Sequence, residues 1–113
     1  MRTMNVAAAQ FQPNDGDKKY NLSVLEKLTA KAKKCGAEVV SFHELCITAY
    51  THLKDLDRGE LEELAEEVPD GASPRELMRQ AGEYDITILA GLLEKENGNY
   101  YNSYVCVGAD GLI

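Results

Sequence analysis

Apolar residues along the chain follow two patterns, short runs typical of buried strands and wider spacings typical of helices. The short apolar runs predict four strands, at residues 4–11, 38–42, 86–93 and 100–107. Between them, apolar residues recur every three or four positions and predict helices at about residues 17–34, 59–67 and 73–84. The adjacent Val39 and Val40 indicate a strand that is buried on both faces. Strands that alternate with helices predict a single α/β domain.

Glycine and capping residues mark the ends of these elements. Gly36 fits the end of the first helix, and Asn97-Gly98 predicts a type I′ turn between the third and fourth strands. Ser73 is expected to cap the third helix, and Glu76 to complete a capping box with it. These residues divide the chain into compact elements joined by short connections.

A further strand is expected to begin at the end of the sequence. Asp110-Gly111 predicts another hairpin turn, and only Leu112 and Ile113 follow it. A strand that has just begun leaves its hydrogen-bonding partners incomplete. We therefore interpret residues 1–113 as part of a longer polypeptide, with a frayed apolar tail as the alternative.

Composition and charge narrow the class of protein. The 113 residues carry a net charge of −7 and are 44% apolar, values that suit a globular protein without a nucleic-acid or anionic-membrane surface. No segment approaches the roughly 20 apolar residues that span a bilayer. The three cysteines, Cys35, Cys46 and Cys106, form no disulfide pattern. We expect a cytoplasmic protein with reduced thiols.

Glu44 is the first candidate for chemistry, because it lies just beyond the carboxyl end of the second predicted strand. Active sites of open α/β folds gather at the carboxyl ends of strands, where loops converge. A carboxylate at the rim of an apolar sheet is expected to be partly desolvated, which favours a general base that works near neutral pH. The alternative is a structural carboxylate that pairs with a lysine.

The neighbours of Glu44 favour neither metal binding nor a local nucleophile. His43-Glu44 could begin a zinc-binding HExxH motif, but Ile47 stands where the second histidine is required. His43, Cys46 and His52 have no recognised spacing for metal ligands. Cys46 could contact Glu44, but a small buried side chain is the usual role of a free cysteine. We therefore expect no metal site and a packing role for Cys46.

Several stretches, taken in order, resemble the nitrilase superfamily of carbon–nitrogen hydrolases. The segment AEVVSFHELCITAY, residues 37–50, is similar to the family signature, commonly ADLVVFPELCLTGY. The other matching stretches are the opening AAAQ strand with Pro13, Asn21-Leu22, Gly91 to Glu94, Tyr101-Asn102-Ser103 and Ala109-Asp110-Gly111. Each piece is weak by itself, but the ordered set covers essentially the whole chain.

The resemblance implies a fold and a mechanism. The fold is the N-terminal part of a four-layer α-β-β-α sandwich. The family uses a glutamate as general base, a lysine that stabilises developing charge, and a cysteine that forms a covalent thioester. It uses neither a metal nor an organic cofactor. Matched residue by residue, Glu44 takes the base position, and Tyr50 lies in the part of the motif near the substrate pocket.

The resemblance also implies what residues 1–113 lack. The family's lysine and cysteine would follow the strand that begins at Leu112, and Lys95 does not match the lysine motif. We therefore expect a partial hydrolase domain that is inactive alone. The complete protein is expected to be a homo-oligomer that hydrolyses a small amide, carbamoyl compound or nitrile. A non-enzymatic α/β interaction module is the alternative.

Two positions depart from the family signature. His43 replaces the usual proline before the glutamate, which leaves Glu44 in register but can alter the end of the strand. Ala49 replaces the common glycine before Tyr50, which we expect to be a mild change.

Overall fold

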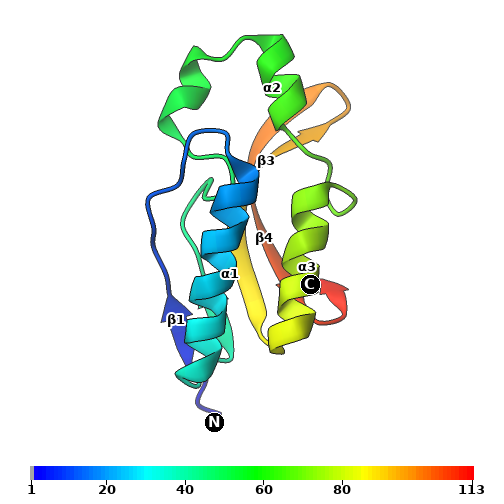
Figure 1. Cartoon of the computed structure of the whole chain (residues 1–113). Coiled ribbons are helices and arrows are strands. Elements are labelled where there is room, and N and C mark those ends of the chain that lie inside the picture. Colours follow the sequence, from blue (N-terminus) through cyan, green and yellow to red (C-terminus); the bar gives the residue numbers. More distant parts are fainter. Residues whose placement is uncertain (1) are drawn as a thin grey trace.

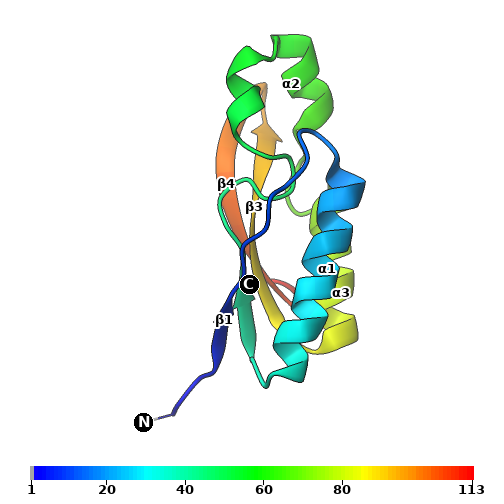
Figure 2. The same ribbon diagram turned by 60° about the vertical axis from the view of Figure 1, so that its left-hand side comes forward.

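The computed structural model describes residues 2–113 as a five-stranded sheet with two helices packed on one of its faces. Figures 1 and 2 show α1 and α3 side by side on that face, while α2 lies at the end of the sheet where the β3–β4 hairpin turns. The strands are β1 (Val6–Ala8), β2 (Val39–Ser41), β3 (Thr87–Glu96), β4 (Asn99–Gly108) and β5 (Gly111–Leu112). The helices are α1 (Lys18–Lys34), the 3₁₀ helix η1 (Thr51–Asp55), α2 (Arg58–Leu64) and α3 (Ala72–Tyr84).

The strands lie in the order β1-β2-β3-β4-β5, and the pairing between neighbours changes from parallel to antiparallel at β3. β1, β2 and β3 are parallel, and β3, β4 and β5 are antiparallel. Val40 pairs with Ile88 of β3, and Ile88 pairs with Val107 of β4. This mixed sheet confirms the predicted α/β class, and the α1 and α3 layer on one face is the arrangement expected for half of an α-β-β-α sandwich.

β3 is much longer than β2, so most of its edge is paired by loop segments. β2 pairs with β3 only as far as Leu89. Further along, the Ile47 N–H donates to the Gly91 carbonyl at 3.3 Å. The Glu66 N–H then donates to the Leu93 carbonyl at 2.9 Å. The chain between Ile47 and Glu66, which includes η1 and α2, leaves the sheet edge and returns to it.

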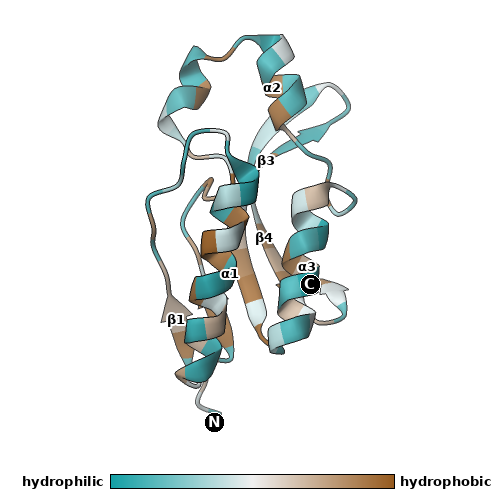
Figure 3. Cartoon of the chain, viewed as in Figure 1, coloured by the Kyte–Doolittle hydropathy of each residue, from teal (hydrophilic) through white to brown (hydrophobic). Residues whose placement is uncertain are grey.

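The main hydrophobic core lies between the sheet and the helices α1 and α3. In Figure 3 the middle of β3 has hydrophobic colours, whereas α2 and the tip of the β3–β4 hairpin are mostly hydrophilic. The largest fully buried apolar side chains are Leu25, Ile47, Leu77, Ile88, Leu92, Val40 and Val107. Burying a side chain of this size stabilises the fold by about 1.5–3 kcal/mol. A smaller cluster of Leu45, Ala65 and Leu93 lies near the hairpin tip.

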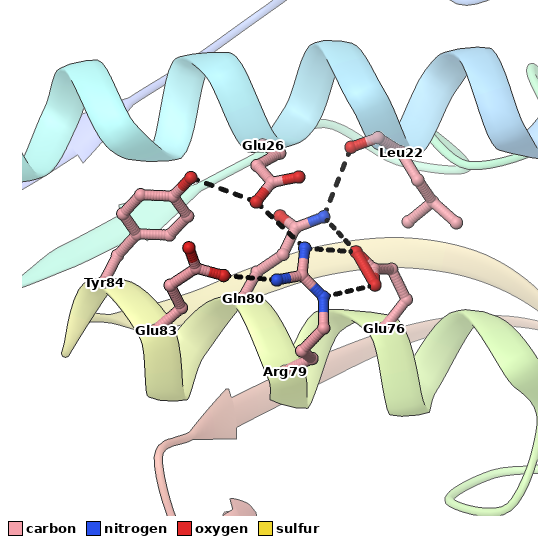
Figure 4. A network of polar contacts seen from close by, with 7 residues as sticks. All are labelled: Leu22, Glu26, Glu76, Arg79, Gln80, Glu83 and Tyr84. Atoms are coloured by element: carbon pink, nitrogen blue, oxygen red, sulfur yellow. Dashed lines mark hydrogen bonds and ion pairs between the residues drawn. The ribbon is translucent and has the colours of Figure 1, made fainter.

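Polar side chains join the two helices along their outer edge (Figure 4). Arg79 of α3 bonds with the carboxylates of Glu26, Glu76 and Glu83. Glu26 belongs to α1 and also accepts a hydrogen bond from the Tyr84 hydroxyl at 3.0 Å. Gln80 donates to the Leu22 carbonyl of α1 at 3.3 Å. These contacts supplement the apolar packing that fixes α1 against α3.

The predicted capping box at Ser73 is wrong. Gly71 is the N-cap of α3, and Ser73 lies buried in the first turn. Its N–H donates instead to the carboxylate of Glu66 at 2.7 Å, and Lys18 pairs with the same carboxylate at 3.0 Å. Burial acts to raise the pKa of Glu66, but the Ser73 and Lys18 contacts outweigh it and hold that pKa below its usual range. A tertiary partner thus replaces the local cap.

Two predicted boundaries are confirmed, whereas the first strand, predicted at residues 4–11, is only Val6–Ala8 and the second helix, predicted at 59–67, ends at Leu64. Gly36 has φ = +91° just after α1, as a helix stop requires. Asn97 and Gly98 have φ of +53° and +78°, which confirms the type I′ turn. α2 carries a capping box that the sequence interpretation missed, with Asp57 as the cap and Glu60 as its partner.

Across residues 2–113, no helix is both long enough and apolar enough to cross a bilayer.

Candidate active site

Glu44 lies in an irregular loop that follows β2, here called the site loop and defined as residues 42–50. Its carboxylate oxygen Oε1 accepts a hydrogen bond from the side-chain amide of Asn102, which lies in β4. The expectation that the sheet rim desolvates this carboxylate is wrong for the described residues, where Glu44 is exposed. The loop carries Glu44 outward from the strand end, so its orientation depends on a hydrogen bond rather than on burial.

Gly91 of β3 allows the site loop to lie directly on the sheet. A Cβ atom at this position would lie 2.3 Å from the backbone nitrogen of Leu45 and 3.0 Å from the Glu44 Cα. The loop is held there by hydrogen bonds from the Phe42 N–H to Leu89 and from the Ile47 N–H to Gly91. The backbone of Glu44 therefore has a position that only glycine on β3 permits.

Asn21 of α1 fixes the other side of the site loop. Its side chain is fully buried and donates to the carbonyls of Ile47 at 2.8 Å and Asn14 at 2.9 Å. Its side-chain oxygen accepts the Asn14 N–H at 2.8 Å. The Gly16 N–H adds a bond to the Thr48 carbonyl at 2.8 Å. The loop before α1 and the site loop are thus joined through one buried amide.

Two residues of the site loop adopt left-handed backbone conformations. Leu45 has φ = +51° and Ala49 has φ = +67°. A residue with a Cβ is disfavoured there by about 1–2 kcal/mol, a cost that glycine does not carry. Alanine in place of the family's glycine therefore carries a small backbone cost, because at Ala49 the backbone has the geometry that glycine prefers.

Glu44 and Tyr50 line the same small cavity. This cavity has a volume of about 210 Å³, and its wall also includes His43, Ala49 and Thr51. Tyr50 is 58% exposed, which leaves its ring accessible from this side of the molecule. The structure therefore brings together the two residues that the sequence singled out.

A second cavity of about 390 Å³ adjoins the first and shares Leu45, Tyr50 and Thr51 with it. Leu53 and Leu93 give it apolar walls, while Lys54 and Asn102 contribute polar groups. Pockets of this composition suit small molecules that have an apolar body and a few polar atoms. Asn102 thus connects the carboxylate of Glu44 with this neighbouring space.

Cys46 has the packing role that we predicted for it. Its side chain is fully buried and its Sγ donates to the Gly91 carbonyl at 3.7 Å. Burial raises the pKa of the Cys46 thiol to about 11, so the thiolate that a nucleophile requires is disfavoured. Cys46 therefore helps to attach the site loop to β3.

The remaining candidate residues have separate partners. The ring of His43 lies 5.2 Å from that of Phe11, and the His52 Nδ1 lies 3.5 Å from the carboxylate of Asp15. Among residues 2–113, no group of three or more His, Cys, Asp and Glu side chains is arranged to hold a metal ion. Lys95 pairs with Glu62 of α2 at 3.1 Å, near the hairpin tip.

The roles of Asn21 and Asn102 were missed by reasoning from sequence. Both belong to matching family stretches, but neither carried a role there. Asn21 had a usable signal, because it lies four residues before Leu25, on the apolar face of its helix. A polar residue at such a position needs buried partners. Asn102 had no usable signal in the sequence, because its contact with Glu44 joins residues that are 58 positions apart.

Comparison with known proteins identifies the family of this chain. The carbon-nitrogen hydrolase family model matches residues 5–113. The chain belongs to the carbon–nitrogen hydrolase family. It is 36% identical over 110 residues to a nitrilase from Pyrococcus abyssi, which covers 97% of this chain and 41% of that protein. It is 27% identical to a citrullinase from Francisella tularensis over 113 residues, which covers all of this chain and 38% of the relative.

Solved structures of this family share the fold. XC1258 from Xanthomonas campestris, a CN-hydrolase superfamily protein, matches with a TM-score of 0.82 at 15% identity, over all of this chain and 40% of that one. An amidase from Nesterenkonia sp. matches with a TM-score of 0.76 at 16% identity, over 97% of this chain and 40% of that one. These likenesses confirm the predicted fold, and the chain spans about two fifths of each of these proteins.

Proposed function

We propose that the protein containing this chain hydrolyses a non-peptide C–N bond in a small amide, carbamoyl compound or nitrile, with Glu44 as its general base. Membership of the carbon–nitrogen hydrolase family supports a hydrolase over a non-enzymatic interaction module. The observation that carries the proposal is the placement of Glu44. It lies beyond the end of a parallel strand, in a cavity shared with Tyr50, with its carboxylate oriented by Asn102.

The proposed reaction has two stages. Glu44 accepts the proton of a cysteine thiol, and the thiolate attacks the carbonyl or nitrile carbon of the substrate. For an amide, the tetrahedral intermediate expels ammonia or an amine, which takes the proton from Glu44, and a thioester remains. Glu44 then accepts a proton from the water that attacks the thioester carbon. The C–S bond breaks, the acid is released, and the proton passes from Glu44 to the departing cysteine sulfur. A lysine stabilises the negative charge that develops on oxygen or nitrogen.

The cysteine and the lysine are proposed to come from the part of the protein that follows this chain. Cys46 is buried, and Lys95 pairs with Glu62 near the hairpin tip, so neither fits these roles. Residues 1–113 alone are therefore expected to be inactive. Tyr50 is proposed to contact the substrate, because its exposed ring borders both cavities. The complete protein is proposed to be a homo-oligomer, and the chemistry requires no metal or organic cofactor.

The test is Glu44→Gln in the full-length protein, assayed on simple amides, N-carbamoyl amino acids and nitriles. Glutamine keeps the size of the side chain but cannot accept the thiol proton, so kcat/KM should fall by about 10²–10⁴-fold. Glu63→Gln is the matched control, because Glu63 is an exposed carboxylate of α2, and it should leave kcat/KM unchanged. A Glu44→Gln enzyme with near wild-type kcat/KM would show that Glu44 is not the base.

A further inference from the structure

We propose that Asn102 is a positioning residue that holds Oε1 of Glu44, so that the catalytic proton is exchanged only at Oε2. This inference rests on the proposed role of Glu44 as general base. Its starting point is the hydrogen bond from the side-chain amide of Asn102 to Oε1. The bond joins a strand of the sheet to the loop that carries the carboxylate.

The register of the sheet places Asn102 on the face that the site loop and Glu44 occupy. Asn102 pairs with Leu93 of β3, and Tyr104 pairs with Gly91. Because residues two apart on a strand share a face, Asn102 and Tyr104 lie on the same side of the sheet as the surface of Gly91 on which the site loop rests. Asn102 therefore approaches the loop from a strand that is fully hydrogen-bonded on its β3 side.

The same strand holds the site loop at a second point. The Tyr104 hydroxyl donates to the Phe42 carbonyl at 2.6 Å. Two alternate residues of β4 therefore bond to two alternate residues of the loop, Tyr104 to Phe42 and Asn102 to Glu44. The first contact involves the loop backbone, whereas the second involves only the carboxylate. This difference assigns Tyr104 to the fold of the loop and Asn102 to the orientation of Glu44.

The chemistry of an amide suits this task. The Asn102 amide is a hydrogen-bond donor that does not titrate, so it cannot compete for the proton that Glu44 must accept and return. While Oε1 is held, the S–H bond of the nucleophile breaks and an O–H bond forms at Oε2. The electron pair left on sulfur then forms the bond to carbon. When the C–N bond breaks, the proton passes from Oε2 to the leaving nitrogen, and the contact at Oε1 is kept throughout.

Two substitutions in the full-length protein test the inference. Asn102→Leu removes the donor at nearly constant size, so kcat should fall about tenfold while KM stays within about twofold. Asn102→Asp replaces the donor with a second carboxylate at the same shape. Like charges in contact resist double ionisation, so the acid limb of the kcat/KM profile should move up by about one pH unit. The other charged groups around the two cavities, His43, Asp15 and Lys54, are unchanged in both variants.

Asn99→Asp is the matched control, because it places the same charge on the same strand, at the turn end. Its kcat and its acid limb should match the wild type. The substrate is the fastest of the amides, N-carbamoyl amino acids and nitriles used for Glu44→Gln. Circular dichroism reports whether each variant folds, and Asn102→Asp, which preserves shape, decides the question if Asn102→Leu does not.

The outcomes separate this inference from the proposed function. Near wild-type activity of Glu44→Gln would defeat both. An inactive Glu44→Gln enzyme together with unchanged kcat and pH profile in both Asn102 variants would overturn only the role of Asn102. A raised KM with unchanged kcat and an unmoved acid limb would also overturn it, because Asn102 would then bind substrate rather than position the base.

Discussion

The helix layer of α1 and α3 and the site loop are held in place by different kinds of contact. Each helix is stabilised by its own backbone hydrogen bonds and by an apolar stripe that includes Leu25 or Leu77. The site loop has no regular structure of its own. It is fixed by atoms of distant elements, among them the Gly91 backbone and the buried amide of Asn21. Local sequence therefore determines the layer that supports the site, and long-range contacts determine the site.

Among the substitutions that test this difference, Gly91→Ala should change the free energy of unfolding most. The added Cβ would lie 2.3 Å from the backbone of Leu45, so the site loop must move away from β3. The free energy of unfolding of the full-length protein should fall by about 3 kcal/mol, measured by chemical denaturation at fixed protein concentration. Activity should fall with it, because Glu44 moves with the loop.

The matched control for Gly91→Ala is the same substitution in the helix layer. Gly82 is exposed in α3, and a Cβ there would meet its nearest neighbour at an ordinary 4.0 Å. Gly82→Ala should raise the free energy of unfolding by up to about 1 kcal/mol, because alanine favours the helix. Similar effects of the two substitutions would show that the site loop does not rest on β3 as described.

Replacing Asn21 with leucine should have the next largest effect. The change leaves the Ile47 carbonyl and the Asn14 backbone groups without their side-chain partner. Buried polar groups without partners cost about 1–3 kcal/mol, so the free energy of unfolding should fall by about that amount and kcat should fall as the loop loosens. Ser23→Ala on the exposed side of α1 is the control and should change little. A loss of stability no larger than that of Ser23→Ala would contradict the role of the Asn21 amide in holding the site loop.

The smallest expected effect is a gain in stability from Ala49→Gly. Glycine adopts the φ of +67° at this position without the steric cost of a Cβ. The free energy of unfolding should rise by about 0.5–1 kcal/mol, measured as above. Ala30→Gly, at a helical position of α1, should instead lower it by about 1 kcal/mol. A loss of stability in both variants would indicate that the site loop relaxes around alanine at no cost.

Sequence reasoning succeeded where structure follows from local pattern. It predicted α1 almost to the residue, the turn at Asn97-Gly98 and the position of Glu44 beyond β2. It failed at Ser73, because the partner that overrides its capping role is Glu66, a residue in a separate segment. It also gave no account of the contact between Asn102 and Glu44.

The reason for the failures is that these contacts depend on how the chain returns to β3 after the site loop. A hydrogen bond between residues 58 positions apart follows only once the sheet register is known. The left-handed backbone at Ala49 likewise follows from the path that the loop takes across Gly91. Single-sequence patterns carry neither of these facts.

One segment of the chain leaves the edge of β3 and later returns to it. This path affects how such a protein can diversify. Ile47 bonds to Gly91 and Glu66 bonds to Leu93, so both ends of the intervening segment are anchored within one short stretch of the same strand. Residues can be added to the exposed segment between η1 and α2 at a small entropic cost, without shifting either anchor or the sheet register. Tyr50 and Leu53 belong to this excursion and line the cavities beside Glu44. The molecule therefore separates the anchored loop that carries Glu44, the proposed general base, from a cavity wall formed by one excursion of the chain.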